Sequence, residues 1–259
     1  MAETQIKFDD GAAYERMMGV WSRIAGSIFL DWLAPAKGLR WADVGCGNGA
    51  FTELLIARCA PAQVSGVDPS AGQISYARSR PGCKTANFQE GDAMALPFPD
   101  KSFDIAAMAL VLFFVPDPAK GVAEMIRVVR AGGTVAAYVW DLLGGGFPLD
   151  ALQVEMRAMN IPVPMPPSAD ISRMEALQTL WAQAGLKSIE SRTIEVTRDF
   201  HGFDEFWEVA LLSPSSGSVL AKLAPDVRET LRARVHARMN AGEGKLIARA
   251  HANAIRGRV

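Results

Sequence analysis

Apolar and polar positions follow two different periods along the first half of the chain. Short, almost entirely apolar runs are separated by segments whose apolar residues recur every three or four positions. The runs predict strands at 39–45, 63–68, 84–90, 103–113 and 133–140. The other segments predict helices at 50–60, 70–79 and 118–130. Strands that are apolar on both faces and separated by helices indicate a parallel sheet covered on both sides.

A further helix is expected before this core. Residues 12–33 carry apolar side chains at three- and four-residue steps, and Pro35 and Gly38 end the pattern. We therefore predict that residues 1–38 form an N-terminal helix that caps the core.

The pattern changes after Asp141. Three consecutive glycines at 144–146 predict a flexible joint, and the proline-rich segment 161–167 is incompatible with a helix or an inner strand. A short helix is expected between them at 149–160. We interpret residues 142–170 as a lid-like insertion over the functional edge of the sheet.

The C-terminal third returns to regular patterns. They predict helices at 172–184, 203–212 and 218–241 and strands at 188–198 and 246–259. Residues 1–259 are therefore expected to form one α/β domain with a Rossmann-like, mostly parallel sheet of seven strands and a helical cap. Its parts would be the N-terminal helix, a core at 39–141, the lid at 142–170, and the rest of the sheet with inserted helices at 171–259.

Composition excludes several classes of protein. Of the 259 residues 49% are hydrophobic and 21% are charged, so a large core can be buried. The net charge of −1 provides no field that would attract nucleic acid or an anionic membrane. The three cysteines show neither a disulfide framework nor metal-ligand spacing, so no metal site is expected. The longest apolar run, 105–115, is about half of the ~20 residues that a membrane-spanning helix needs.

Two further sequence features concern compartment and partners. The N-terminus carries acidic residues and no apolar signal segment, which predicts a cytoplasmic protein without a membrane span. The arginines of the C-terminal third lack interleaved aromatic residues, so we interpret them as a solvated surface and expect no nucleic-acid partner. The oligomeric state is not encoded in any pattern that we recognise.

The strongest local signal is a glycine-rich turn between the first strand and the next helix. Gly45, Gly47 and Gly49 would let a ligand approach the backbone, and the helix N-terminus presents free N–H groups. Nineteen residues after Gly49, the next strand ends at Asp68, where a carboxylate can accept hydrogen bonds from ribose hydroxyls.

Two interpretations of this turn compete. Gly45-x-Gly47-x-x-Ala50 with Asp68 also fits the relaxed dinucleotide fingerprint, which would indicate an NAD-dependent oxidoreductase. Two features argue against an oxidoreductase: Asp43 lies two residues before the first glycine, and the glycines have GxGxG spacing. The third strand also ends in Gly-Asp-Ala, at 91–93, which offers a second carboxylate.

These segments together resemble a known family. DVGCGNG, GVDPS, GDAMALPFPDKSFD, FVPDPAKGVAEMIRVVRAGG and TVAAYVW, between 39 and 141, are similar to class I S-adenosylmethionine-dependent methyltransferases. The nearest branch is the small-molecule one that includes ubiquinone and menaquinone biosynthesis enzymes. The resemblance implies a Rossmann-like seven-stranded methyltransferase fold, a cofactor-binding core at 39–141 and S-adenosylmethionine as cofactor, with S-adenosylhomocysteine as product.

The resemblance also implies roles for individual residues. Asp43 would hold the amino group of the cofactor's methionine part, because opposite charges attract. The three glycines would pass under the methionine and ribose, and Asp68, followed by Pro69, would bind the ribose diol. Asp92 would accept from the adenine amino group, to whose ring the Ala93 N–H would donate.

Further implied contacts lie beyond the core motifs. The backbone at Ala109 and Leu110 would border the transferred methyl group. In the segment YERMMGVWSR, Tyr14 and Arg23 would face the cofactor's carboxylate. The alternative for Arg23 is a solvated charge on an amphipathic helix.

Acceptor and base candidates follow the strand ends. One of Phe113 and Phe114 is expected to line an acceptor pocket, with a place in the core as the alternative for both, and Trp140 is a pocket candidate because it ends the fifth strand. Asp141 and His201 are weak candidates for a general base, with a helix cap or loop role for Asp141 and a structural or exposed role for His201 as the alternatives. A methyltransferase needs a base only when its acceptor does not ionise readily, so the catalytic residue is unassigned.

Three functions remain open on the sequence. The first is methyl transfer from S-adenosylmethionine to a small molecule by in-line displacement. The second is a non-catalytic module that keeps the fold and the cofactor pocket but serves as a binding partner or a sensor. The third is the nicotinamide oxidoreductase. The acceptor and the atom that is methylated are not specified by any motif.

Overall fold

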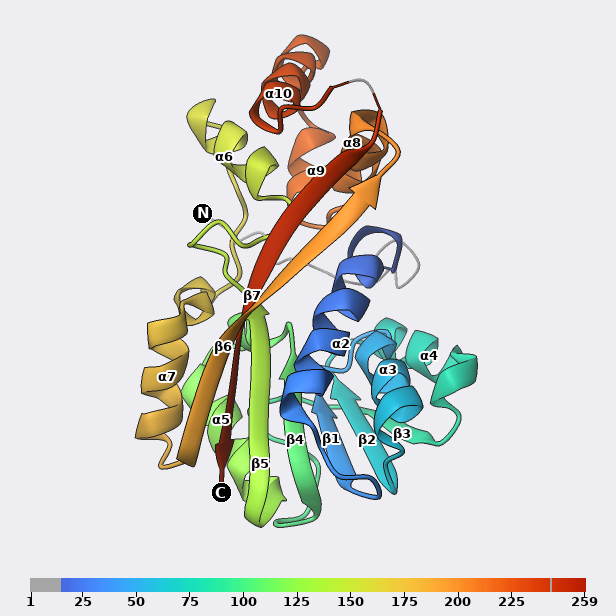
Figure 1. Ribbon diagram of the computed structural model, residues 1–259, viewed down its shortest axis with the longest axis vertical. Helices are drawn as coiled ribbons and strands as arrows, with labels where there is room; N and C mark the ends of the chain where they lie inside the picture. Colours follow the sequence, from blue (N-terminus) through green and yellow to red (C-terminus); the bar gives the residue numbers. More distant parts are fainter. Residues whose placement is uncertain (1–14, 243) are drawn as a thin grey trace.

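The computed structural model describes residues 15–242 and 244–259. Within them seven strands form one sheet in the order β3-β2-β1-β4-β5-β7-β6 (Figure 1). The strands are β1 (Arg40–Val44), β2 (Gln63–Asp68), β3 (Ala86–Glu90), β4 (Phe103–Ala109), β5 (Val129–Trp140), β6 (Lys187–Phe200) and β7 (Leu246–Arg258). The first five pair in parallel, and β7 runs antiparallel to both β5 and β6.

The position of β7 separates this sheet from that of dinucleotide-binding proteins. A doubly wound dinucleotide-binding sheet has the order 3-2-1-4-5-6, with its strands mostly parallel. Here β7 lies between β5 and β6 and reverses direction. The predicted seven-stranded, mostly parallel fold is confirmed, and its topology differs from the dinucleotide-binding alternative.

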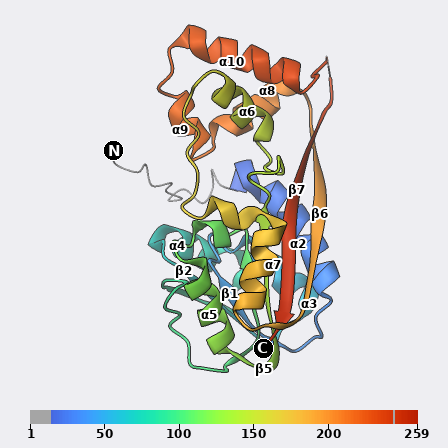
Figure 2. The same cartoon turned by 90° about the vertical axis from the view of Figure 1, so that its left-hand side faces the viewer.

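Helices cover both faces of the sheet. α2 (Val20–Leu33) and α3 (Ala50–Cys59) lie on one face, and α5 (Pro118–Val128) and α7 (Met174–Gln183) lie on the other (Figures 1 and 2). The remaining helical elements are η1 (Glu15–Gly19), α4 (Ala71–Ser79), η2 (Pro81–Cys83), η3 (Leu112–Phe114), α6 (Asp150–Ala158), η4 (Ala169–Ser172), α8 (Phe203–Leu211), α9 (Ser216–Leu220) and α10 (Pro225–Arg238).

The last two strands are longer than the sheet that they complete. β6 and β7 pair from Lys187↔Arg258 to Phe200↔Leu246, whereas β5 and β7 stop pairing at Trp140↔Ala252. The free end of this two-stranded ribbon reaches the group formed by α6, α8, α9 and α10 (Figure 1). These helices form a cap above the carboxyl ends of the parallel strands. The sequence-based prediction gave the capping role to residues 1–38 instead, and in the described part of that segment α2 packs into the core.

Ion pairs link the two sides of the cap. The Glu155 carboxylate of α6 accepts from Arg234 at 2.7 Å and from Arg238 at 2.6 Å, both on α10. Glu155 is 7% exposed, and the two arginines hold its pKa below the usual value through hydrogen bonds and charge. These ion pairs therefore join α6, which follows β5 in the chain, to α10, which follows β6.

Three element boundaries differ from the predictions. The strand expected at 103–113 ends at Ala109, because Leu110 adopts a left-handed conformation (φ 63°) and its N–H donates to the Tyr138 carbonyl oxygen at 2.8 Å. The helix expected at 218–241 is two helices, with Pro225 in the first turn of the second, where it needs no N–H partner. Strand β5 begins at Val129, inside the predicted helix 118–130.

The main core is one cluster of buried apolar side chains that extends over both faces of the sheet, and α2 contributes to it. Trp21 and Phe29 of this helix are buried, and the Phe29 ring lies 4.7 Å from that of Tyr138 on β5. The N-terminal helix is therefore part of the core wall. No helix in 15–242 or 244–259 is both long and apolar enough to span a membrane.

Candidate functional site

The larger cavity lies at the carboxyl ends of the parallel strands. It has a volume of about 1220 Å³ and is lined by the loops after β1, β2, β3 and β4 together with residues 162–167. A carboxyl edge of this kind is where ligands bind in open α/β sheets. Segment 162–167, part of the insertion interpreted as a lid, lines this cavity, and its action as a lid stays a prediction.

Gly45 and Gly47 of the glycine-rich turn line the larger cavity, whereas Gly49 does not. All three glycines have positive φ, at 73° for Gly45, 50° for Gly47 and 81° for Gly49. A Cβ on Gly45 would lie 2.4 Å from the Val111 side chain, whereas a Cβ on Gly47 would meet nothing within 4 Å. Gly47 lines the cavity, so a side chain there would enter the space left for a ligand.

Asp68 connects this turn with the loop after β2. One carboxylate oxygen accepts from the Gly47 N–H at 2.9 Å and the other from the Ser70 N–H at 3.0 Å. Burial raises the pKa of Asp68, and these two hydrogen bonds lower it by less. Asp68 and Pro69 both line the larger cavity. Since each carboxylate oxygen can accept more than one hydrogen bond, Asp68 is able to bind a diol from this position.

Asp43 lies under the turn and is fully buried. One of its oxygens accepts from the Thr52 hydroxyl, and the other has no hydrogen-bond partner among the described residues. Burial raises the pKa of Asp43 to about 7, and the nearby charge of Asp68 adds to this effect. Asp43 is not among the residues that line the larger cavity. Its role toward a cofactor amino group stays a prediction, supported by the unpartnered oxygen.

The expected adenine and methyl contacts are brought to the same cavity. Asp92, Ala93, Ala109 and Leu110 all line it. Asp92 is exposed at the end of β3, and its carboxylate accepts from the Met94 N–H at 2.8 Å. The structure therefore gathers both downstream carboxylates and the end of β4 around one space.

The N-terminal candidates are placed differently. Tyr14 lies outside the described residues. Arg23 donates to the Glu15 carboxylate and does not line the larger cavity, whereas its neighbour Ser22 does. The structure thus shows Arg23 with a partner on its own segment, and its contact with a cofactor carboxylate stays a prediction.

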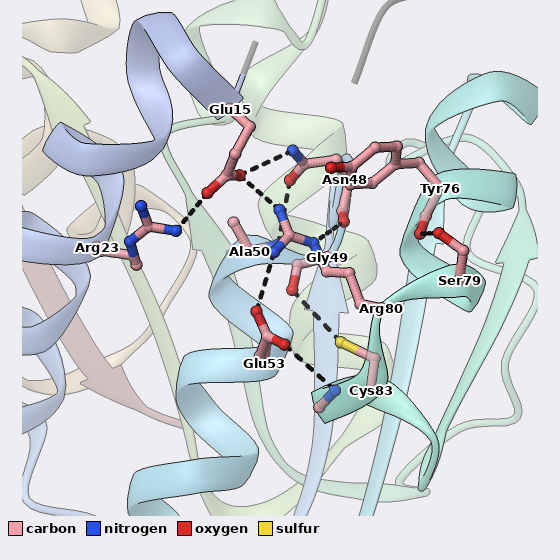
Figure 3. Close-up of polar contacts among 11 residues, drawn as sticks. Glu15, Arg23, Asn48, Gly49, Ala50, Glu53, Tyr76, Ser79, Arg80 and Cys83 are labelled. Carbon is pink, nitrogen blue, oxygen red and sulfur yellow. Dashed lines mark hydrogen bonds and ion pairs between the residues drawn. The ribbon is translucent and has the colours of Figure 1, made fainter. Parts of the chain in front are cut away.

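A charged network beside the turn was not found from the sequence (Figure 3). Arg80, which follows α4 and is 10% exposed, donates to Glu15 at 2.5 Å, to Glu53 at 2.9 Å and to the Asn48 carbonyl oxygen at 2.6 Å. The Asn48 amide also donates to Glu15, at 3.2 Å. Nothing in the local sequence distinguishes Arg80 from other surface arginines, since its partners lie 27 to 65 residues away.

The network has a clear electrostatic effect. Burial alone would raise the pKa of Glu15, but the hydrogen bonds and charges of Arg80, with the help of Arg23 and Asn48, lower it. Glu15 is therefore ionised at neutral pH and ties η1 to the glycine-rich turn.

A smaller pocket adjoins the larger cavity on the side of the cap. Its volume is about 60 Å³, and the two spaces share Leu110, Phe114 and residues 164–166. The three acceptor-pocket candidates, Phe113, Phe114 and Trp140, all line the smaller pocket. Phe113 and Trp140 are also buried, so they are part of the core as well as of the pocket wall.

Neither base candidate lines either space. The Asp141 carboxylate accepts from the Gly144 N–H at 2.8 Å and lies 3.3 Å from His251 Nε2, an arrangement that holds the turn at 141–146. The His201 side chain is 99% exposed and pairs with Glu205. These contacts match the alternative interpretations, a loop role for Asp141 and an exposed site for His201.

Comparison with known proteins now identifies the domain. Residues 42–137 match the family described as a methyltransferase domain. The chain therefore carries a methyltransferase domain, and the resemblance inferred from the motifs is confirmed.

Curated relatives cover this region and some flanking sequence. The chain is 39% identical over 107 residues to 2-methyl-6-phytyl-1,4-hydroquinone methyltransferase 2 of Oryza sativa, which covers 40% of this chain and 31% of the relative. It is 38% identical over 162 residues to the O-methyltransferase cnsE of Penicillium expansum, covering 61% and 55%. The matches thus span about a third to a half of the relatives' length.

Solved structures extend the similarity to the whole fold. Phosphoethanolamine N-methyltransferase 2 of Haemonchus contortus, in complex with S-adenosyl-L-methionine, aligns with a TM-score of 0.60 and 19% identity over 99% of this chain and 58% of that one. The cyclase SpnF aligns with a TM-score of 0.54 and 20% identity over 92% and 81%. The fold is that of S-adenosylmethionine-dependent methyltransferases, and it also supports an enzyme described as a cyclase.

Proposed function

We propose that this chain transfers a methyl group from S-adenosylmethionine to a small-molecule acceptor. The observation that carries the proposal is Asp68, held by the Gly47 and Ser70 N–H groups at the edge of the larger cavity. A carboxylate in this position, next to an open glycine turn, fits the ribose of an adenosyl group. The methyltransferase relatives and the S-adenosylmethionine complex of a structural neighbour support the same cofactor.

The residues around the larger cavity would each contact a different part of the cofactor. Asp68 and Pro69 would hold the ribose, and Asp92 with the Ala93 N–H would hold the adenine. The turn with Gly45, Gly47 and Gly49 would lie under the methionine part, with Asp43 beneath it. Ala109 and Leu110 would border the sulfonium methyl group.

When bound, S-adenosylmethionine would supply an electrophilic methyl group, bordered by Ala109 and Leu110. An acceptor lone pair would take this methyl group in an in-line displacement, the electron pair of the broken carbon–sulfur bond would stay on sulfur, and an acceptor that carries a proton would lose it to solvent. The chain's contribution is to align the two reactants and exclude water, which can supply on the order of 7–11 kcal/mol. The absence of an ionisable base beside the smaller pocket, among the described residues, is consistent with such a mechanism.

Calorimetric titration with S-adenosylhomocysteine tests the cofactor part. Asp68→Ala removes an anionic hydrogen-bond acceptor and should weaken binding by about 10- to 100-fold. Asp31→Ala is the matched control, since Asp31 is an exposed carboxylate on α2 that pairs with Arg58. No binding to folded wild-type protein, or preferential binding of NAD, would refute the proposal.

A second candidate function rests on the same cavity. No candidate base lines the spaces, and a cyclase shares the fold, so a ligand-binding or non-methylating role is the alternative. Incubation with methyl-labelled cofactor and an acceptor panel separates the two. Tight cofactor binding without transfer to any acceptor would favour the alternative.

A further inference from the structure

The short element η1 contacts the walls of both spaces. Glu15 at its start accepts from the amide of Asn48, a residue that lines the larger cavity. Met17 and Met18 in its middle line the smaller pocket and are only 3% and 5% exposed. The five residues form a single π-helical turn, and short π-helical stretches often occur at functional sites. A movement of η1 would therefore alter both spaces at once.

A carboxylate anchors the start of η1 to the glycine-rich turn (Figure 3). Glu15 accepts from Arg80 at 2.5 Å and from the Asn48 amide at 3.2 Å, and Arg80 also donates to the Asn48 carbonyl oxygen at 2.6 Å. The Arg80 and Glu15 side chains are 10% and 20% exposed, so salt screens this pair less than it screens a surface ion pair. These three residues hold η1 against the edge of the larger cavity.

This anchor depends on a glycine. The Glu15 carboxylate lies against Gly19, where an added Cβ would come within 2.6 Å of the Glu15 Cδ and within 2.9 Å of both carboxylate oxygens. Such distances are shorter than van der Waals contact, so the flexible Glu15 side chain would have to leave its place. The φ of Gly19 is −58°, which any residue can adopt. Gly19 is therefore needed for the position of a carboxylate and not for the backbone conformation.

An arginine of the β6–β7 ribbon anchors the middle of η1. Arg198 on β6 is 9% exposed, donates to the Met17 carbonyl oxygen at 3.0 Å and lies 4.5 Å from the centre of the Phe200 ring. Burial lowers the pKa of Arg198, and the charge of Glu205 offsets only part of this effect. Because a buried cation is costly, its bond to the Met17 carbonyl stabilises this arrangement. Arg198 thereby holds Met17 in the wall of the smaller pocket.

Resting on the proposed function, we infer that Glu15 and Arg198 are positioning residues that couple the cofactor site to the smaller pocket through η1. The turn that carries Asn48 becomes more rigid when the cofactor is bound, which strengthens the contact between Asn48 and Glu15. With its start fixed in this way, η1 keeps Met17 and the residue after it in the pocket wall. Coupling of this kind is reciprocal, so a docked η1 also favours cofactor binding. Occupation of the cofactor site thus completes the pocket for the acceptor.

Backbone hydrogen exchange with and without saturating S-adenosylhomocysteine, followed by mass spectrometry, tests this coupling. In the wild-type protein we expect the ligand to slow exchange across η1 about fivefold. Exchange across α7, which lines neither space, should stay the same. Unchanged exchange across η1, although calorimetry shows that the ligand binds, would overturn the inference. Failure of the wild-type protein to bind the ligand would instead defeat the proposed function.

Gly19→Ala separates the anchor from helix stability. Alanine favours a helix more than glycine does, so a merely structural role of this position predicts slower exchange across η1. Displacement of the Glu15 carboxylate predicts the opposite: the protection by S-adenosylhomocysteine should be lost, and the affinity for this ligand should fall about fivefold. In a Glu15→Ala background the same substitution should have no further effect, because the carboxylate is already absent. Full protection in Gly19→Ala, or equal losses in both backgrounds, would overturn the role of Glu15.

A second pair of variants tests the anchor on the ribbon. Arg198→Met removes the donor to the Met17 carbonyl, so the protection of η1 by S-adenosylhomocysteine should fall from about fivefold to about twofold. Arg256→Met is the matched control. Arg256 on β7 donates to the Trp32 and Leu33 carbonyl oxygens and lies over the Trp32 ring, at the end of α2 that is distant from η1. It should leave the protection unchanged, and equal effects of the two substitutions would overturn the role of Arg198.

Discussion

The larger cavity is built mainly by short loops at the ends of neighbouring parallel strands, with residues 162–167 closing one side. The smaller pocket is assembled from five segments spread between residues 17 and 215. The loops present backbone N–H groups, glycines and carboxylates such as Asp68. The five segments present mostly apolar side chains. A ligand with fixed polar groups can be bound by a compact motif, while an apolar ligand needs walls on several sides.

The two regions are also stabilised by different means. The turn beneath the larger cavity is held by hydrogen bonds and by the network around Arg80 (Figure 3). The cap above the smaller pocket is held by the β6–β7 ribbon and the Glu155 ion pairs. A substitution at the turn should therefore change the affinity for the cofactor far more than the affinity for an acceptor. A substitution in the cap should do the reverse.

The largest expected effect is that of Gly47→Val. The new side chain would enter the space assigned to the cofactor and also impose strain at φ 50°, so binding of S-adenosylhomocysteine should weaken more than about 100-fold. Calorimetry measures the affinity, and thermal unfolding measures the strain. Gly38 has a φ of 75°, an added Cβ would meet nothing within 4 Å, and the residue lines neither space. Gly38→Val therefore carries similar strain but should bind S-adenosylhomocysteine with the wild-type affinity. Similar losses in both variants would mean that Gly47 does not border the cofactor.

Arg80→Met should have the next largest effect. It leaves Glu15 and Glu53 without their shared cation, so we expect η1 to loosen from the turn. Affinity for S-adenosylhomocysteine should fall about tenfold, and the free energy of unfolding should fall by about 1–3 kcal/mol after allowance for partial exposure. Arg58→Met, which breaks an exposed pair with Asp31, is the control. Unchanged cofactor affinity with a loss of stability would assign Arg80 a purely structural role.

The raised pKa of Asp43 predicts a pH dependence on the cofactor side. The folded protein holds a proton on Asp43 up to about pH 7, whereas the unfolded chain releases it near 3.8. Stability should therefore decrease by a few kcal/mol at most as the pH rises from about 4 to 7. If Asp43 holds the cofactor amino group, the ionised form binds better, so affinity for S-adenosylhomocysteine should rise severalfold from pH 6 to pH 8.

Asp43→Asn distinguishes these effects from the titration of other groups. The variant cannot ionise at this position and should lose most of both pH dependences, measured by calorimetry and by denaturant unfolding. Retention of the affinity profile would assign the dependence to another group, such as Asp68, whose pKa is also raised by burial.

The smallest expected effect is that of Glu155→Gln on the cap. It removes the charge that faces Arg234 and Arg238, both of which are nearly half exposed, so the loss of stability should stay near 1 kcal/mol. Because α6 carries Gln153 of the smaller pocket, the affinity of a ligand that binds in this pocket should fall about twofold to threefold. Cofactor affinity should not change, and a change in it would contradict the separation of the two regions.

The sequence was most informative where the structure is local. The parallel strands, the glycine-rich turn and the spacing to Asp68 are encoded within short stretches, and the structure places them as expected. The end of β4 was wrong by four residues because the left-handed conformation of Leu110 depends on a hydrogen bond to β5. The break between α9 and α10 could have been predicted from Pro225.

By itself the amino-acid sequence determined the class of fold, the domain family and the kind of cofactor, because periodicity and turn chemistry act between near neighbours in the chain. Only the tertiary structure decided that Arg80 meets Glu15 and that Trp140 joins Met17 around one pocket. Such contacts depend on how distant segments pack, and no local pattern of residues specifies which apolar or charged side chains will meet.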